Sequence, residues 1–305
     1  MKAKTLLALL ATLSTALAQG PAPAADAAPV RIHIIGASVS AGFEDGPLFG
    51  AEKQGDSVPL QTVFRAWADD AGKVTTHSPM EMAVLFQKPV EVAEHELALL
   101  KKRKPDVVLA VDFLFWFAYG YVSGDELQAR SLLLHKGLDM LTGIGKPVLI
   151  GDLPDMTGAA RRMLSPRQIP SPEVLEKLNA EIRAAVAANP NLHLVPLADF
   201  VAASRGKGLV LPLAAGPLQT APGALQQEDR LHATRLGVAY LSSVVQPHLV
   251  ALMPEDHPLR ARQWTLEQFI AAAGAEDELA ALREKAAAGA GAAEAGKADA
   301  GKERR

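Results

Sequence analysis

The sequence predicts one doubly wound α/β domain with a mainly parallel sheet over residues 30–252. Short apolar runs alternate there with amphipathic stretches, which is the order of strands and helices in such domains. The apolar runs are nearly continuous rather than alternating with polar residues, as strands are when helices cover both faces of a sheet. A domain of this size buries enough surface to fold without disulfides.

Five strands and five helices account for this stretch in order. The first strand is the β-branched run 30–35, which ends at Gly36. The other strands are expected at 73–76, 106–111, 147–153 and 192–197, and the helices at 59–71, 90–102, 125–141, 172–188 and 234–252. Ser171 is placed to cap the fourth helix, since Pro172 follows it at the first helical position.

The first 18 residues are typical of a signal peptide. Lys2 and Lys4 precede an apolar run of about 13 residues, and a small-x-small pattern stands before Gln19. The run is shorter than the ~20 residues of a membrane-spanning helix, although an uncleaved anchor stays open as the alternative. We expect a secreted or periplasmic protein with no membrane span after cleavage, and a flexible Ala/Pro-rich leader at 19–29.

The C-terminal part is expected to differ from the domain. Residues 253–285 are interpreted as a helical appendage, with one helix over 265–285. Residues 286–305 are Ala, Gly, Lys, Glu and Asp with almost no large apolar side chain, and so we expect a disordered tail.

Composition excludes several classes of function. The 305 residues carry a formal net charge of −3 and no Cys. A near-neutral chain without a basic cluster is not expected to bind nucleic acid. Without Cys there is neither a thiolate metal site nor a Cys nucleophile, and the His residues lack ligand spacing, so no metal is assigned. The oligomeric state stays open.

Chemistry in an open α/β sheet is expected beyond the carboxyl ends of the strands. Ser38 follows the first strand in a glycine-rich turn, and a Ser hydroxyl needs a base to act as a nucleophile. His232 is the candidate base, and Asp229 lies three residues before it, where a carboxylate can bind Nδ1–H and leave Nε2 free. The alternatives are an inert turn Ser and a capping carboxylate beside a structural His.

These residues resemble the motifs of the GDSL/SGNH hydrolases. The run G-A-S-V-S-A-G at 36–42 is similar to the family's first block, G-D-S-x-x-x-G. The run D-R-L-H at 229–232, with Gly237 downstream, is similar to its last block, D-x-x-H. The resemblance covers about residues 30–250 and implies a three-layer α/β/α sandwich with a flavodoxin-like, five-stranded sheet. It also implies an esterase mechanism without cofactor, with Ser38 as nucleophile, His232 as base and Asp229 as orienting acid.

The sequence departs from the family pattern where the donors to an oxyanion are expected. The third strand ends at Asp112 instead of the family's G-x-N-D, and the second-block glycine is not evident around His77 and Ser78. Loss of one such donor costs about 10²–10³ in rate. His77 and Ser78 are candidate substitutes, and the N–H of Ser38 or Val39 is a remaining donor. Asp112 is expected to cap the helix that follows it, or to face the site in protonated form.

Six of the chain's 15 aromatic residues follow the third strand within nine positions, Trp116 among them. They are interpreted either as an apolar wall at the mouth of the site or as a buried plug. Three carboxylates at 91, 94 and 96 are expected on a solvated helix face.

Three functions fit these residues. The first is an exported serine hydrolase of small-molecule esters, with carbohydrate and lipid esters included. The second is a non-catalytic relative that binds a saccharide or envelope component, which the missing Asn and Gly favour. The third is a flavodoxin-like module whose turn at 36–42 cradles a flavin or phosphate on backbone N–H groups. The D-x-x-H motif at 229–232 would have no role in this third function, which counts against it.

Overall fold

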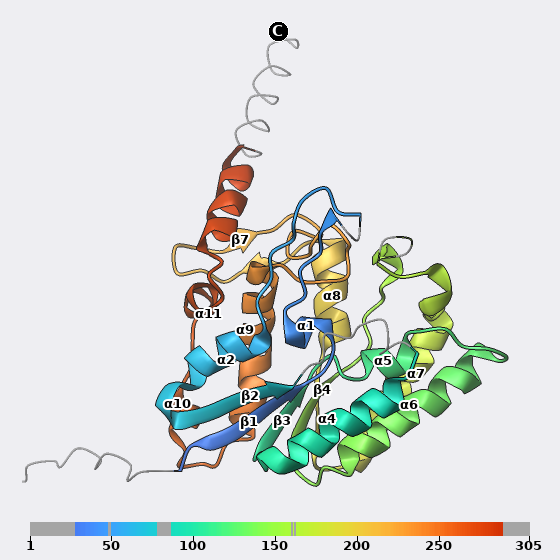
Figure 1. Cartoon of the computed structure of the whole chain (residues 1–305). Coiled ribbons are helices and arrows are strands. Elements are labelled where there is room, and N and C mark those ends of the chain that lie inside the picture. Colours follow the sequence, from blue (N-terminus) through green and yellow to red (C-terminus); the bar gives the residue numbers. More distant parts are fainter. Residues whose placement is uncertain (1–27, 48–49, 78–86, 160, 162, 289–305) are drawn as a thin grey trace, which may run out of the picture.

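The computed structural model describes residues 28–47, 50–77, 87–159, 161 and 163–288 (Figure 1). Five parallel strands form one sheet in the order β2-β1-β3-β4-β5. The strands are β1 (Val30–Ile35), β2 (Gly72–His77), β3 (Val107–Ala110), β4 (Val148–Gly151) and β5 (Leu192–Val195). This is the flavodoxin-like order, and it confirms the predicted fold class.

Helices cover both faces of the sheet and make the three layers (Figure 1). On one face lie α4 (Pro89–Arg103), α6 (Glu126–Thr142) and α7 (Pro172–Ala188). On the other lie α2 (Leu60–Ala68) and α9 (Arg235–Ala251). Ser171 accepts a hydrogen bond from the N–H of Val174 and so caps α7 as expected.

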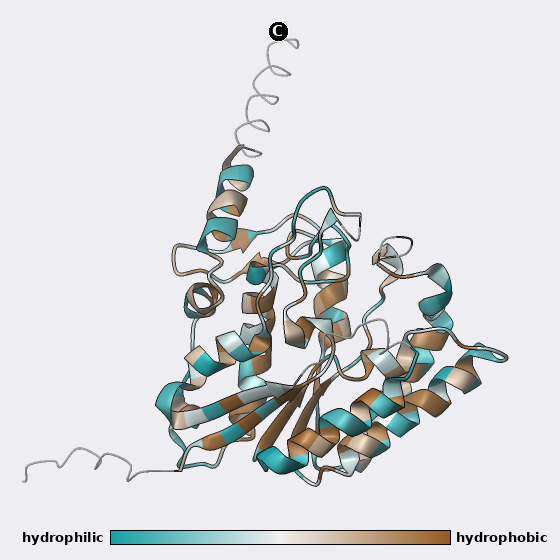
Figure 2. Cartoon of the chain, viewed as in Figure 1, coloured by the Kyte–Doolittle hydropathy of each residue, from teal (hydrophilic) through white to brown (hydrophobic). Residues whose placement is uncertain are grey.

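The core is the space between these layers. The strands are apolar along their length and the helices turn polar faces outward (Figure 2). Trp67, Phe64 and Ile34 are fully buried between sheet and helices. Continuous apolar strands therefore did indicate a sheet that is covered on both sides.

The C-terminal helix is shorter than the sequence pattern predicts. Instead of one helix over 265–285, α11 (Leu266–Ala273) ends at Gly274, whose φ of 63° is left-handed, and a second helical run begins at residue 276. Phe269 of α11 is fully buried and packs against Phe64 and Trp264. The α11 segment therefore shares the core of the domain.

Several short elements have no counterpart in the sequence expectations. A helix, α8 (Leu197–Gly206), begins directly after β5, where a longer strand was expected. It is followed by an antiparallel pair, β6 (Val210–Leu211) and β7 (Leu218–Gln219). The other short helices are α1 (Ser38–Ala41), α5 (Phe115–Ala118) and α10 (Pro258–Ala261), and the 3₁₀ turns are η2 (Asp69–Ala71), η3 (Thr157–Ala159) and η4 (Pro166–Gln168). The expected signal peptide, most of the leader and most of the tail lie outside the described residues.

Candidate active site

The turn after β1 places Ser38 at the carboxyl edge of the sheet. Gly36 has a φ of 151°, and a Cβ on it would lie only 2.1 Å from Oδ1 of Asp112, so this position requires glycine. Ser38 then opens α1 and is 7% exposed. Within the described part of the chain, neither its Oγ nor its N–H forms a hydrogen bond. Both groups are therefore free to meet a ligand.

Asp112 holds this turn from the neighbouring strand. Its Oδ2 accepts hydrogen bonds from the N–H of Val39 (2.9 Å) and of Ser40 (3.0 Å), and its Oδ1 accepts one from Ser40 Oγ (2.6 Å). Burial raises the pKa of Asp112, and these hydrogen bonds oppose the rise. The side chain thus caps α1 rather than the helix that follows it in sequence, which corrects that expectation.

The engagement of Val39 changes two sequence interpretations. Its N–H was a candidate donor to an oxyanion, yet in this structure it donates to Asp112. Ser38 N–H is the main-chain donor that the turn leaves open. The phosphate-cradle interpretation loses two of the N–H groups that it needs, because Ser40 N–H is bound in the same way.

A second carboxyl group lies buried near this turn. Glu96 on α4 is only 2% exposed, which corrects its expected place on a solvated helix face. Burial, and then the negative charge of Asp112, raises the pKa of Glu96 to about 9. Glu96 is therefore protonated at neutral pH, and two carboxyl groups share this apolar region.

The loop before α9 supplies an oriented imidazole. Oδ2 of Asp229 is hydrogen-bonded to Nδ1 of His232, and Oδ1 accepts the N–H groups of Leu231 (2.8 Å) and His232 (3.0 Å). Burial disfavours the charged form of Asp229, but the hydrogen bonds and charge of His232 outweigh it and hold the pKa of Asp229 below its usual value. Within the described residues, Nε2 of His232 is buried and has no hydrogen-bond partner.

Two side chains tie this loop to the Ser38 turn. Phe43 donates its N–H to the carbonyl of Ser38 (3.0 Å), and its ring lies against the ring of His232 with 4.1 Å between centroids. Buried Gln227 donates to the carbonyl oxygens of Phe43 and Ala233, both at 2.8 Å. The structure thus brings the first and last motifs to one edge of the sheet, without a hydrogen bond between Ser38 Oγ and His232 Nε2.

A small apolar pocket opens beside Ser38. This Ser38 pocket has a volume of about 60 Å³. Leu231 and Ala233, the neighbours of His232 in sequence, line it. Larger apolar side chains among its other lining residues are Phe115, Leu153, Met156, Phe200, Val201 and Leu225. Two carboxyl residues, Asp112 and Asp152, also line it. Its size and lining suit a short apolar group.

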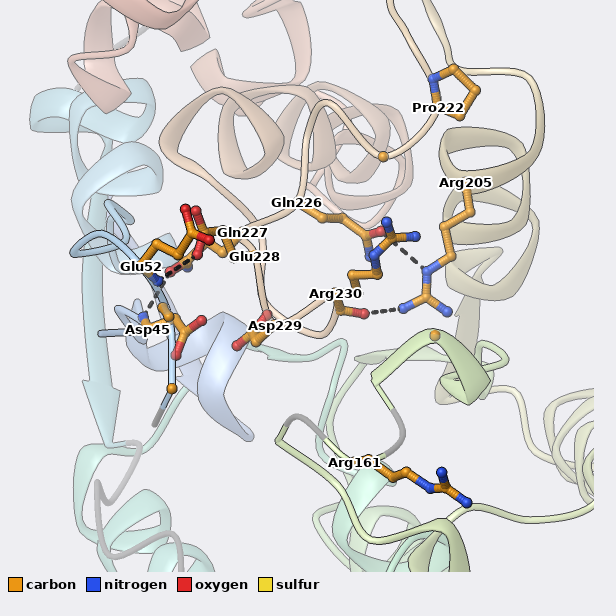
Figure 3. Close-up of a pocket in the computed structure, with 14 residues that line it drawn as sticks. Asp45, Glu52, Arg161, Arg205, Pro222, Gln226, Gln227, Glu228, Asp229 and Arg230 are labelled. Atoms are coloured by element: carbon orange, nitrogen blue, oxygen red, sulfur yellow. Dashed lines mark hydrogen bonds between the residues drawn. The ribbon is translucent and has the colours of Figure 1, made fainter. Parts of the chain in front are cut away.

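A larger charged pocket adjoins it. This arginine pocket has a volume of about 940 Å³, and Gln226 lines both pockets. Figure 3 shows the carboxyl groups on one side of it and Arg205 and Arg230 on the other. The charged residues that line it are Asp45, Glu52, Glu228, Asp229, Arg161, Arg205 and Arg230. Burial, and then the charge of Asp229, raises the pKa of Asp45.

The remaining sequence candidates lie elsewhere. Trp116 is 5% exposed and lines neither pocket, and Phe113, Phe117 and Tyr119 are also buried, so the aromatic cluster is mainly a plug in the core. Phe115 is the member that reaches the Ser38 pocket. His77 ends β2 at the same sheet edge, and Ser78 lies outside the described residues.

The sequence analysis gave no role in the site to Gln227, Phe43 or Arg205, and it placed Glu96 on the wrong side of its helix. The position of Gln227 two residues before Asp229 was the one available signal, and the others carry no motif. Among the residues described, no cluster of three His, Asp or Glu side chains is arranged to hold a metal ion. None of the described helices is both long and apolar enough to cross a bilayer.

Comparisons with known proteins find remote structural similarity. No protein-family model and no curated protein matches the chain. Among solved structures, the chain is similar to TesA (17% identity, TM-score 0.41, 73% of this chain and 99% of that one). It is also similar to an acylhydrolase of Bacteroides fragilis (11%, 0.44, 73% and 88%) and to an SGNH hydrolase of Slackia heliotrinireducens (14%, 0.41, 72% and 97%). Similarities this remote do not by themselves assign a function to the chain.

Proposed function

We propose that the protein is an exported serine hydrolase of esters that works through an acyl-enzyme. The observation that carries the proposal is the Asp229–His232 pair. A buried carboxylate fixes the imidazole through Nδ1, while Nε2 is buried without a partner in the described residues, on the sheet edge that also holds Ser38. The Nε2 of His257 is also buried without a partner among the described residues, but its Nδ1 accepts a main-chain N–H, whereas the Nδ1 of His232 is held by a buried carboxylate.

The reaction follows from these roles. Ser38 Oγ attacks the ester carbonyl carbon as His232 Nε2 takes the hydroxyl proton, and Asp229 stabilises the imidazolium that forms. The tetrahedral intermediate collapses by breaking the bond to the alcohol oxygen, which receives that proton from Nε2. A water molecule, activated by Nε2, then attacks the acyl-enzyme, releases the acid and restores Ser38. Ser38 N–H donates to the oxyanion.

Ligand-free serine hydrolases tolerate a long Ser–His separation, because such hydrogen bonds tighten only in the substrate complex. The Ser38 pocket receives the acyl group and limits it to a few carbon atoms. The export assignment rests on the charged start, apolar run and small-x-small pattern of residues 1–18.

One observation favours a second function, in which the protein binds an ester or saccharide ligand without cleaving it. Val39 N–H, a donor that an active oxyanion hole would use, is bound to Asp112. With that donor engaged, catalysis rests on fewer groups, and each lost donor costs about 10²–10³ in rate.

Covalent labelling separates the two functions. We expect a fluorophosphonate to add one phosphonyl group to the full chain, located on Ser38 by peptide mass spectrometry, and to leave Ser38→Ala unlabelled. Ser131→Ala, on α6 away from the site, serves as the matched control and is labelled normally. An unlabelled wild-type chain that also fails to hydrolyse 4-nitrophenyl acetate would favour the binding function.

A further inference from the structure

Two arginine side chains, Arg205 and Arg230, line one side of the arginine pocket (Figure 3). Arg205 and Arg230 both reach Gly158: a Cβ on that glycine would lie 3.9 Å from Cζ of Arg205 and 3.8 Å from Cδ of Arg230. Burial lowers the pKa of Arg205, the negative charge of Asp155 opposes this fall, and the positive charge of Arg230 adds to it. The charges of these two side chains interact unfavourably, and so an anion between them would be stabilised.

Arg205 is held rigidly in this position. Its guanidinium donates to the carbonyl oxygens of Asp155 and Arg230, to Oε1 of Gln226 (3.1 Å) and to Sδ of Met156 (3.0 Å). The Asp155 carboxylate lies near but accepts from Thr157. The hydrogen-bond acceptors of this guanidinium are neutral, and because the side chain is already fixed it loses little entropy on binding a ligand.

Arg230 is placed by the backbone. Its φ of 56° is left-handed, a conformation that costs a non-glycine residue about 1 kcal/mol or more and that recurs at ligand sites. Arg161, across the same pocket, also has a left-handed φ, of 61°. Among the described residues, neither Arg161, Arg205 nor Arg230 forms an ion pair within 4 Å.

The arginine pocket adjoins the site of the proposed reaction. Met156, which touches Arg205, lines the Ser38 pocket, and Arg230 lies between Asp229 and Leu231 in the loop that separates the two pockets. A group bound at Arg205 and Arg230 therefore lies beside the Ser38 pocket. The carboxyl groups of Asp45, Glu52 and Glu228 line the opposite side of the arginine pocket (Figure 3). Their negative charges would direct an anion towards the arginine side.

We propose that Arg205 and Arg230 form an anion-binding subsite that holds a carboxylate, sulfate or phosphate group on the alcohol part of the substrate. The proposal rests on the proposed ester hydrolysis for its place in the reaction, but the binding itself does not need it. Arg230 is then a specificity-determining residue that selects esters of anionic alcohols.

The test measures binding in the full chain with Ser38→Ala, so that turnover plays no part. Sulfate and D-glucuronate are titrated by calorimetry, with D-glucose as the uncharged match for glucuronate. We expect at least one of the two anions to bind and glucose not to bind. Tighter binding of sulfate would indicate a subsite for a tetrahedral group, and tighter binding of glucuronate a subsite for a planar carboxylate.

Arg230→Gln should weaken anion binding about tenfold, the loss of one charge-assisted contact. This variant keeps the bond from Arg205, because that bond goes to the main-chain carbonyl of residue 230. Arg103→Gln, an equal charge change at the far end of α4, should leave binding unchanged. Absence of anion binding, or equal binding by the two arginine variants, would overturn the subsite. Fluorophosphonate labelling of wild type reports separately on the hydrolase.

Discussion

The pocket beside Ser38 is apolar and has a volume of about 60 Å³, whereas the pocket beside Arg230 is charged and has a volume of about 940 Å³. One loop separates them: Asp229 and Arg230 line the large pocket, and Leu231 and Ala233 line the small one. The difference matches the two parts of an ester, a short apolar acyl group and a larger polar alcohol. The five residues 229–233 thus contribute to both halves of the proposed specificity and include the proposed base, His232.

The largest effect should come from the loop itself. Asp229→Asn keeps an acceptor for the main-chain N–H groups of residues 231 and 232 but no longer stabilises an imidazolium. We expect kcat for 4-nitrophenyl acetate to fall by about 10⁴. Asp139→Asn on the exposed face of α6 is the matched control and should behave as wild type. A loss below tenfold would remove Asp229 from the mechanism.

The next largest effect concerns the small pocket. An acyl chain longer than the cavity must displace packed side chains, at about 1–3 kcal/mol. We therefore expect kcat/KM for 4-nitrophenyl octanoate to be about 100-fold below that for the acetate. Phe200→Ala removes a ring from the lining and should reduce this preference about tenfold. Equal rates for the two esters in wild type would show that the acyl group binds elsewhere.

A gain of function is expected at Asp112. Asp112→Asn keeps an oxygen that accepts from the N–H groups of Val39 and Ser40 and removes a carboxylate that opposes a developing oxyanion. The new amide group replaces the oxygen that accepts from Ser40 Oγ, so one of its N–H groups can donate to that hydroxyl and the other to an oxyanion. One oxyanion donor contributes a factor of about 10²–10³ to kcat, and so a partly aligned amide should raise kcat about tenfold. The assay is initial-rate hydrolysis of 4-nitrophenyl acetate, and a fall in kcat would mean that the carboxylate itself is required.

These variants also mark what the sequence alone predicted. The five-stranded sheet followed from continuous apolar runs. The position of Ser38 followed from the rule that sites lie beyond the carboxyl ends of strands, and His232 was selected because Asp229 stands three residues before it. The roles of Asp112 and Arg205 did not follow, because their partners are far away in sequence. Asp112 binds a turn 72–73 residues before it, and Arg205 binds carbonyl oxygens 25 and 50 residues away. No local pattern encodes such contacts.

Glu96 gives a predicted effect on stability rather than on activity. Its pKa is about 9 in the folded chain and about 4.5 when unfolded, so folding favours the protonated form. The free energy of unfolding therefore falls as pH rises from about 4.5 towards 9, by roughly 3 kcal/mol at pH 7. Glu96→Gln should remove this dependence and raise Tm at pH 8 but not at pH 4, as measured by thermal unfolding. Equal Tm values at pH 8 would place Glu96 in contact with water.

The most direct test of the whole account is a double-mutant cycle on kcat/KM with Ser38→Ala, His232→Gln and the two combined. Groups that act as one catalytic unit lose their effect together, so we predict that the double variant is no slower than either single variant. Losses that multiply in the double variant, or a His232→Gln enzyme as fast as wild type, would contradict the proposed partnership between hydroxyl and imidazole.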